Sequence, residues 1–215
     1  MKEKYKYVKE IISDELINFF SSWSITTEDY KGDTQVPMSH GVHSKESEMY
    51  RHLLHFIKPR MEAETGLQLQ PIYCYNRIYL PGANLEIHKD RASCEISLSM
   101  TLNYYYDDPN YKWPLCMENK PIIIKSGDGV IYKGCEVSHW RPIFTQPQPS
   151  WHHQVFCHYV NKDGPYNNLQ EEKTEENVEH NRKFLTLENR GSENPHGRWE
   201  WNEKKQKFFW VDDPI

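Results

Sequence analysis

The stretch LEIHKDRASCEISLSM, residues 85–100, places charged side chains in a segment that alternates like a buried strand. His88 and Asp90 stand two positions apart, and Lys89 and Arg91 each follow one of them. Buried strands rarely accept that much charge without a specific reason. Residues i and i+2 of a strand point to the same face, so this imidazole and this carboxylate form a natural pair of metal ligands. They are the first two residues of a candidate metal site.

The sequence around this stretch has the pattern of a mainly β protein. Short runs rich in Tyr, Ile and Val are separated by Gly, Pro, Asn and Asp from about residue 70 onward. They predict about seven or eight strands, among them IYCYNRIYL, LEIHKD, CEISLSMTLNYYY, KPIIIK, VIYKG, EVSHWRPIF and HHQVFCHYV. No helical period interrupts them, which favours an antiparallel sandwich or a rolled-up barrel over a parallel α/β sheet.

The residues before the β region predict two helices. Ser13 is a candidate N-cap for ISDELINFFSSW, and a second apolar period begins at about Ser44 and stops at Gly66. Each helix has one apolar face, and a sheet would cover it. We therefore expect residues 1–69 to form a helical support for the β core.

The residues after the β region are more polar. NNLQEEKTEENVEHNRK, which begins at Asn167, predicts a solvated helix or a linker. GRWEWNEKKQKFFWV predicts an aromatic hairpin, with Trp199 and Trp201 on one arm and Phe208 and Trp210 on the other. A hairpin alone is marginally stable, so it is expected to dock on the main sheet.

Length and charge limit the class of protein. A chain of 215 residues fits one domain, made of the helical support 1–69, a β core 70–166 and a linker with hairpin 167–215. The net charge of −5, without a cluster of Lys and Arg, argues against nucleic-acid binding. No apolar run approaches the length of a signal sequence or a membrane span, so a cytoplasmic protein without a membrane partner is expected.

The cysteines argue against two further kinds of site. All five are widely spaced, their number is odd, and they never form a C-x-x-C pair. This pattern predicts neither a disulfide framework nor a structural zinc site, and free thiols are expected.

A third metal ligand is expected downstream, at His139. The segment GDGVIYKGCEVSHWRPIF supplies turns and strands that would return the chain to lie beside His88 in a double-sheet barrel. Two histidines and one carboxylate form the facial triad that holds non-haem Fe(II) and leaves coordination positions open, whereas zinc prefers a fourth ligand. His152, His153 and His158 are rival ligands. The last of these lies in an apolar strand, where a histidine is more often only hydrogen-bonded.

A succession of motifs carries a family resemblance: RIYLPGANLEIHKDR, CEISLSMTLNY, WPL, GDGVIYKGCEVSHWR and QVFCHYVNKDGP. Over roughly residues 70–166 it resembles the 2-oxoglutarate and Fe(II)-dependent oxygenase superfamily, and more narrowly its prolyl-4-hydroxylase-like members in bacteria and phages. The resemblance implies a double-stranded β-helix, the jelly-roll shared with cupins, flanked by helices. It also implies that His88, Asp90 and His139 bind Fe(II), that the chain is an enzyme, and that O₂ and 2-oxoglutarate are consumed.

The expected anchor for 2-oxoglutarate departs from the family pattern. Members usually bind its distal carboxylate with an Arg or Lys on the strand that follows the last iron ligand. This chain has no Arg or Lys from Phe144 to Val160. Gln154, His152 or His153 would occupy the position of the usual anchor.

Two arginines nearby are alternative anchors. Arg141 would share the face of His139 two residues earlier in the strand, and Arg77 would share a face with Tyr79, which matches the helping tyrosine of the family. Bidentate pairing with a carboxylate makes the two arginines the best candidates chemically, with an ordinary surface ion pair as the competing interpretation of each.

The resemblance implies hydroxylation of an unactivated C–H bond with release of succinate and CO₂. Asp90 fills a ligand position that halogenating relatives leave open, so hydroxylation is favoured over chlorination. The substrate would be a peptidyl proline, an amino acid or a small metabolite. Two alternatives stay open: a cupin-like metalloenzyme that does not use 2-oxoglutarate, and a non-catalytic ligand-binding barrel.

Overall fold

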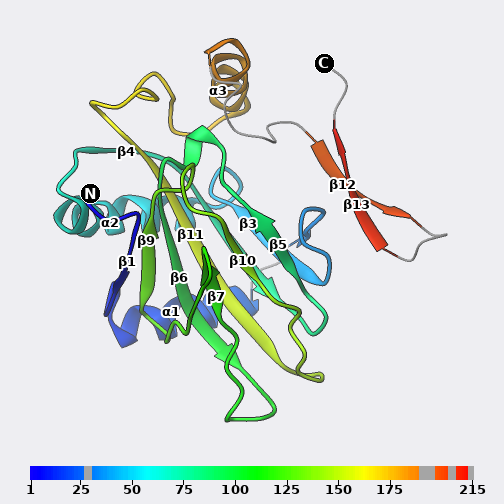
Figure 1. Ribbon diagram of the computed structural model, residues 1–215. Coiled ribbons are helices and arrows are strands. Elements are labelled where there is room, and N and C mark those ends of the chain that lie inside the picture. Colours follow the sequence, from blue (N-terminus) through cyan, green and yellow to red (C-terminus); the bar gives the residue numbers. More distant parts are fainter. Residues whose placement is uncertain (27–30, 189–196, 203–206, 213–215) are drawn as a thin grey trace.

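Two antiparallel β-sheets form the centre of the computed structural model, which describes residues 1–26, 31–188, 197–202 and 207–212 (Figure 1). The larger sheet has the order β1-β9-β6-β11-β4-β3-β2 and contains β1 (Tyr5–Val8), β2 (Lys31–Gly32), β3 (Ser39–His43), β4 (Leu69–Tyr79), β6 (Ile96–Tyr105), β9 (Gly129–Tyr132) and β11 (Trp151–Asn161). The smaller sheet has the order β5-β10-β7-β8 and contains β5 (Leu85–His88), β7 (Leu115–Met117), β8 (Lys120–Ile122) and β10 (His139–Arg141). This is the predicted jelly-roll architecture.

Two helices cover the outer face of the larger sheet. They are α1 (Asp14–Thr26) and α2 (Glu48–Thr65), as the sequence predicts, although α2 begins a few residues later than expected. Gly66 ends α2 in the left-handed conformation, at φ 70°, and its N–H donates to the carbonyl of Glu62. The main core lies between these helices and the sheet and includes Phe20, Leu53, Leu54, Ile57, Met61, Leu98, Met100, Val155 and Cys157.

The region from residue 69 to residue 161, all of which is described, contains the predicted run of short strands. Eight strands, β4 to β11, follow one another there, and β7 is the one that the patterns did not predict. The first 69 residues also contain β1, β2 and β3, which the helical prediction for that region missed. The reason is visible at β1: it is an edge strand in a highly charged segment, and edge strands commonly carry charges that hide the period of two.

The C-terminal region contains α3 (Glu175–Glu188) and the predicted hairpin, β12 (Gly197–Asn202) with β13 (Lys207–Asp212). The backbone register sets Trp199 opposite Trp210 and Trp201 opposite Phe208. These two strands pair with each other and with no other strand in the described part of the chain. Docking of the hairpin on the main sheet therefore stays a prediction.

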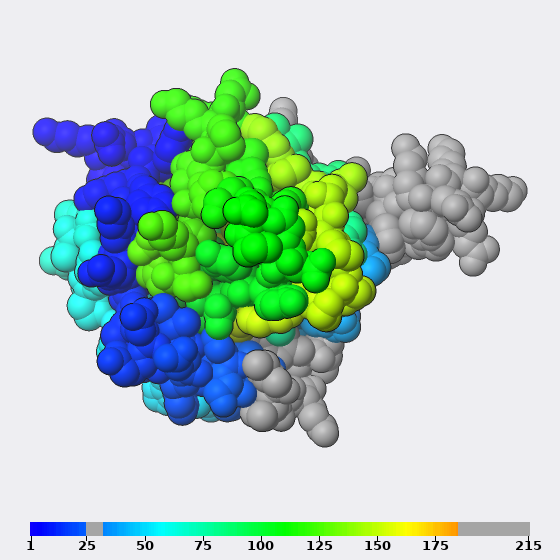
Figure 2. Space-filling model, turned by 90° about the horizontal axis from the view of Figure 1, so that it is seen from below, coloured from blue at the N-terminus to red at the C-terminus, as the bar shows by residue number. Residues whose placement is uncertain are grey.

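The end of the sandwich shown in Figure 2 is closed by the segments that follow β6 and β10, which lie side by side. The indole N–H of Trp113 donates to the carbonyl of Pro142 at 2.8 Å, and the ring of Trp113 packs on Phe144 with centroids 4.8 Å apart. The ring of Tyr106 packs on Phe144 as well. This end is therefore filled by aromatic side chains. Among the described residues no helix is long and apolar enough to cross a membrane.

We predict that Leu54→Ala destabilises the fold by about 2–5 kcal/mol, because it leaves a cavity between α2 and the larger sheet where the side chain is fully buried. Urea unfolding followed by circular dichroism measures the change. Phe56→Ala is the matched control on the same helix, since Phe56 is 60% exposed, and it is expected to cost far less. Equal losses in the two variants would contradict the packing described here.

Candidate metal centre

The candidate metal centre lies where β5 and β10 pair in the smaller sheet. Their antiparallel register sets His88 opposite His139, and the two imidazole centroids are 4.2 Å apart. The Oδ1 atom of Asp90 lies 3.6 Å from the Nε2 atom of each of these histidines. The three side chains predicted as ligands are thus brought together, with their ligand atoms within 4.8 Å of one another.

The outer nitrogen of each histidine is fixed by a backbone carbonyl. Nδ1 of His88 lies 2.8 Å from the carbonyl oxygen of Glu86, and Nδ1 of His139 lies 3.1 Å from that of Val137. In each contact Nδ1–H is the donor, because a carbonyl oxygen can only accept. The lone pair of each Nε2 is then directed to the common centre, which is the tautomer that a metal requires.

The electrostatics of the site keep the carboxylate charged. Burial disfavours ionisation of Asp90, but the attraction of His139 and His88 in their protonated forms outweighs it and holds the pKa of Asp90 well below its usual range. Burial likewise lowers the pKa of His139, against the attraction of Asp90. An ionised carboxylate beside imidazoles is the donor set that a divalent cation needs.

Asp90 owes its position to a tight turn and not to a strand. Strand β5 ends at His88, so the predicted continuation through Asp90 was wrong in detail. The N–H of Asp90 donates to the carbonyl of Gly134 at 3.0 Å. A Cβ atom on Gly134 would lie 2.7 Å from Oδ2 of Asp90 and would also collide with the carbonyl oxygen of Cys94. The absence of a side chain at Gly134 is what lets the carboxylate approach the histidines.

A second group of potential ligands overlaps the first, formed by Asp90, Cys94 and His158. Nδ1 of His158 already lies 2.8 Å from Oγ of Ser97, and Sγ of Cys94 lies 3.1 Å from the hydroxyl of Tyr73. Burial lowers the pKa of His158 to about 4 and raises that of Cys94 above its usual range, so both are neutral. The hydrogen-bonded role expected for a histidine in this strand agrees with these contacts.

The other rival histidines are engaged elsewhere. Nε2 of His153 lies 3.2 Å from Oδ1 of Asn76, on the helix-covered face of the larger sheet. Nδ1 of His152 lies 2.7 Å from the hydroxyl of Tyr106. Neither belongs to a group of described residues that could hold a metal. His139 is therefore the third ligand that the geometry favours.

Arg141 is a buried cation without an acid. It is 1% exposed, its Nη1 donates to the carbonyl of Trp113 at 3.1 Å, and its Nη2 donates to Oε1 of Gln154 at 2.9 Å. Its Nε atom has no hydrogen-bond partner. Among the residues that the structure describes, no carboxylate lies within ion-pair distance of it. Burying an uncompensated charge is costly, and burial lowers the pKa of this guanidinium, so the arrangement calls for an anion that comes from outside the chain.

A neutral network orients Arg141 from behind. Oε1 of Gln154 accepts from Arg141, from the hydroxyl of Thr101 at 3.1 Å and from Nε2 of His152 at 2.9 Å. With Nε2–H donating, Nδ1 of His152 accepts the hydroxyl proton of Tyr106. Burial, and the charge of Arg141, hold the pKa of His152 well below its usual range, so the imidazole is neutral. All the groups behind the cation are dipoles and none is an anion.

Arg77, the other predicted anchor, is compensated within the chain. Its Nε donates to Oδ2 of Asp33 at 2.7 Å, and its Nη2 donates to the side chain of Gln35 at 3.1 Å. Burial disfavours ionisation of Asp33, but Arg77 and a hydrogen bond from Tyr75 hold its pKa below the usual value. Tyr79 lies between the two arginines: Nη1 of Arg77 is 3.4 Å from its hydroxyl, and the guanidinium of Arg141 is 5.9 Å from its ring.

Sequence reasoning missed several of these residues. Asp33 lies in the short connection between β2 and β3, and no local pattern marks it as the partner of Arg77. Trp113 stacks on Arg141, with the guanidinium carbon 4.6 Å from its ring, and no motif marks it for this contact. The five cysteines are free, as predicted, although Cys74 and Cys157 are cross-strand neighbours with sulfur atoms 3.9 Å apart.

Neither a protein-family model nor a curated protein matches the sequence. Solved structures do match in fold. HygX from Streptomyces hygroscopicus, solved with nickel, 2-oxoglutarate and hygromycin B, has a TM-score of 0.60 at 10% identity, over 74% of this chain and 84% of HygX. A Pseudomonas putida prolyl-4-hydroxylase has a TM-score of 0.58 at 13% identity, over 74% of this chain and 94% of that protein.

A viral enzyme has the same fold. The collagen prolyl hydroxylase of Paramecium Bursaria Chlorella virus-1, solved as its 2-oxoglutarate complex, has a TM-score of 0.56 at 10% identity, over 74% of this chain and 96% of that protein. At these identities the likeness concerns the fold. The fold is that of the 2-oxoglutarate and Fe(II)-dependent oxygenases, as the motifs predicted.

We predict that Gly134→Ala weakens divalent-metal binding by roughly 10- to 100-fold, the range seen when the support of a metal ligand is disturbed. The added Cβ displaces Asp90 from the histidines. Titration of metal-free protein with Co(II), followed by its visible spectrum, measures the affinity. Gly32→Ala is the control, because a Cβ there meets nothing within 4 Å. Unchanged Co(II) affinity in Gly134→Ala would contradict the assigned role of the turn.

Proposed function

We propose that this chain is a non-haem Fe(II) and 2-oxoglutarate-dependent dioxygenase that hydroxylates an unactivated C–H bond and releases succinate and CO₂. One observation carries the proposal. Strand β10 bears His139 and, two residues on, the buried guanidinium of Arg141, which has no acid partner among the described residues. Both side chains turn to the larger sheet, where His139 packs against Tyr132 and Arg141 contacts Gln154. A metal ligand and an anion receptor therefore share one face of one strand.

The donor set fits a ferrous ion. His88, Asp90 and His139 would hold it through two neutral imidazoles and one carboxylate, which is the facial arrangement that leaves positions for further ligands. When bound, Fe(II) with 2-oxoglutarate and O₂ would supply the oxidising chemistry, in which the C1 carboxylate of 2-oxoglutarate is lost as CO₂ and the other four carbons become succinate. The two backbone carbonyls behind the histidines keep both imidazoles in the required tautomer while this happens.

Arg141 would bind the distal carboxylate of 2-oxoglutarate. Its unpartnered Nε and its Nη groups form the planar fork that pairs with a carboxylate. Gln154 stands where the family usually places the basic anchor, and here it would orient Arg141 by accepting from Nη2. Tyr79 would help from β4, where its hydroxyl is held by Arg77.

The aromatic side chains around Arg141 would keep water out. Trp113, Phe144 and Tyr79 belong to one buried cluster, and Tyr106 packs against it. In such surroundings a charge-assisted contact is stronger than in water, which favours the dicarboxylate over weakly charged ligands. The alternative function, a cupin-like metalloenzyme that does not use 2-oxoglutarate, does not explain why Arg141 is buried without an acidic partner among the described residues.

The substrate proposed is an amino acid, a peptidyl proline or another small metabolite. This range follows the prolyl-4-hydroxylase resemblance and the fold shared with HygX, which was solved with the small molecule hygromycin B. Asp90 as a protein ligand favours hydroxylation over halogenation.

We predict that purified protein given Fe(II) and 2-oxoglutarate without oxygen develops a weak visible charge-transfer band, and that oxygen then releases succinate. His139→Ala is expected to lose both signals, because one of the three ligands is missing. His153→Asn is a matched control from the other face of the larger sheet and is expected to keep them. Persistence of the band in His139→Ala would place the third ligand elsewhere.

We predict that 2-oxoglutarate raises the melting temperature of the metal-free protein, because it supplies the anion that Arg141 lacks. In Arg141→Gln this stabilisation is expected to vanish, while the melting temperature without ligand falls little or rises, since an uncompensated buried charge has been removed.

Arg77→Gln is the contrasting variant. It leaves Asp33 buried without its cation, so we expect a lower melting temperature that 2-oxoglutarate still raises. Calorimetry measures all three proteins. Stabilisation by 2-oxoglutarate that survives in Arg141→Gln and disappears in Arg77→Gln would move the anchor to Arg77.

A further inference from the structure

A second arginine lies beside the metal turn. Arg91 directly follows Asp90, and its guanidinium carbon lies 5.1 Å from the ring of Tyr73 on β4. Tyr73 faces the site: it is opposite His158 in the register of β4 and β11, and its hydroxyl contacts Sγ of Cys94 at 3.1 Å. The Arg91 side chain is 42% exposed, so solvent reaches it there.

The acid that pairs with Arg91 comes from the segment that follows the β core. Glu172 is buried, and Oε1 of Glu172 lies 3.5 Å from Nη2 of Arg91. The same carboxylate lies 3.2 Å from Nε2 of His43 and 3.4 Å from the side-chain amide of Asn181. Burial disfavours ionisation of Glu172, but His43 and Arg91 hold its pKa below the usual value. Glu172 is thus an ionised group with several partners, of which Arg91 is one.

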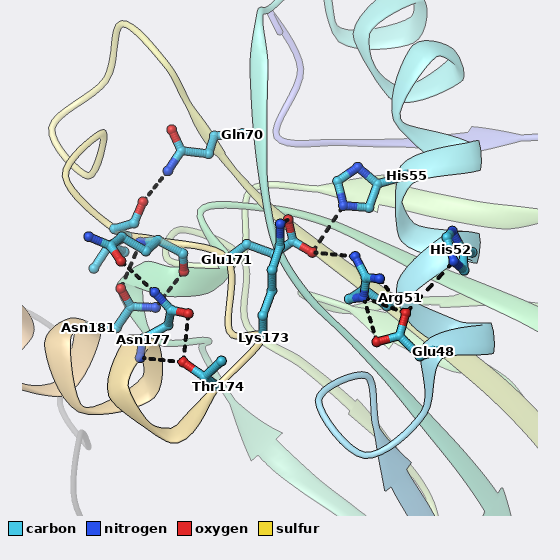
Figure 3. A network of polar contacts seen from close by, with 12 residues as sticks. Glu48, Arg51, His52, His55, Gln70, Glu171, Lys173, Thr174, Asn177 and Asn181 are labelled. Atoms are coloured by element: carbon cyan, nitrogen blue, oxygen red, sulfur yellow. Dashed lines mark hydrogen bonds and ion pairs between the residues drawn. The ribbon is translucent and has the colours of Figure 1, made fainter.

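The segment that carries Glu172, residues 169–173, is held in place by contacts that do not involve Arg91 (Figure 3). Glu171 contacts Nε2 of His55 at 3.0 Å and Nη1 of Arg51 at 4.0 Å, both on α2. The side chain of Gln70 donates to the carbonyl of Leu169, next to these contacts. Docking of residues 169–173 therefore does not depend on the guanidinium of Arg91.

The metal turn is also fixed without that guanidinium. The backbone N–H of Asp90 is bound by the carbonyl of Gly134, and the N–H of Cys94 donates to the carbonyl of Arg91, which closes the turn. Arg91 has five N–H donors. In the described part of the chain its one ion pair is the 3.5 Å contact with Glu172, which leaves donor capacity for a ligand.

Resting on the proposed function, we infer that Arg91 is a specificity-determining residue that binds the α-carboxylate of the substrate, and that Glu172 positions it. Arginine pairs with a carboxylate through two parallel N–H donors, and the Tyr73 ring beneath the guanidinium fixes its plane. The substrate class that fits is a free amino acid or the C-terminal residue of a peptide, in preference to a residue inside a chain. The carboxylate would be held beside Asp90, next to the metal.

The test uses the full chain with Fe(II) and 2-oxoglutarate and measures succinate released above the basal rate. The probes are the L-amino acids and a series of glycyl dipeptides, each supplied as the free carboxylate and as the primary amide. We expect at least one carboxylate to stimulate turnover and its amide to be at least roughly tenfold weaker. Free amino acids and dipeptides separate the two sources of the carboxylate.

Four variants test which side chains bind the carboxylate of the substrate. Arg91→Gln is expected to raise the KM of the stimulating carboxylate by roughly 10- to 100-fold, the effect of losing hydrogen bonds to a charged group, with a smaller change in kcat. Arg91→Lys is expected to recover part of it. Lys89→Gln removes an exposed cation on the other side of Asp90, and Glu171→Gln removes one contact with α2 while the hydrogen bonds of Gln70 to Leu169 and of Glu172 to Ile72 still hold the segment. Both are controls expected to keep the basal rate and this KM.

Glu172→Gln tests the positioning role. It is expected to raise the same KM in the wild-type background and to have no further effect in Arg91→Gln, because it acts through that residue. Circular dichroism shows whether Glu172→Gln folds. If it does not, the Arg91 variants still test whether Arg91 binds the carboxylate, since the side chain at that position is partly exposed.

The possible failures are distinct. No basal succinate release in the wild-type protein would defeat the proposed function. Basal release with equal stimulation by carboxylate and amide, with no stimulation by any carboxylate, or with an unchanged KM in Arg91→Gln, would overturn the assignment of Arg91 alone. Additive effects of Glu172→Gln and Arg91→Gln would overturn the positioning role.

Discussion

The pairing of β5 with β10 is the constraint on which the candidate site depends. It sets His88 opposite His139, and the turn after β5 then brings Asp90 to both imidazoles. Because side chains alternate along a strand, a slip of one residue would turn one histidine away from the other. Gly134 extends the constraint beyond the sheet, since the turn can close on Asp90 only where no Cβ stands in the way. Position, and not unusual residue chemistry, makes three ordinary side chains into a candidate ligand set.

The two buried arginines differ in whether the chain supplies an acidic partner. This difference distinguishes a structural arginine from one that is available to bind a ligand. Arg77 has its acid, Asp33, at 2.7 Å, and the pair is complete within the chain. Within the described ranges Arg141 has only carbonyl and amide oxygens as partners, and one of its N–H groups has none. Both residues sit on the inner faces of their sheets, so burial alone does not distinguish them. The missing acid does, because a cation that folding has removed from water without compensation requires an anion from elsewhere.

The part of the site that local patterns encode was predictable. The two-residue spacing of His139 and Arg141 predicted that they share one face of a strand, and the punctuation by Gly and Pro predicted the succession of short strands. What depends on contacts between distant segments was not predictable. Asp33 meets Arg77 and Glu172 meets Arg91 across long separations in the chain, and no period or motif links the members of either pair. The edge strands β1 and β2 were missed for a related reason, since an edge strand gains its register from its neighbour and not from its own sequence.

Strand β11, which contains the sequence HHQVFCHYV, carries several uncharged polar side chains among its apolar residues. Its residues with even numbers face the smaller sheet, and three of them serve the two halves of the site. His152 and Gln154 supply neutral dipoles behind Arg141, at one end. His158, at the other end, bonds Ser97, which lies 3.5 Å from the second oxygen of Asp90. Acidic residues at these positions would neutralise Arg141 or compete with Asp90, so uncharged polar groups suit this strand.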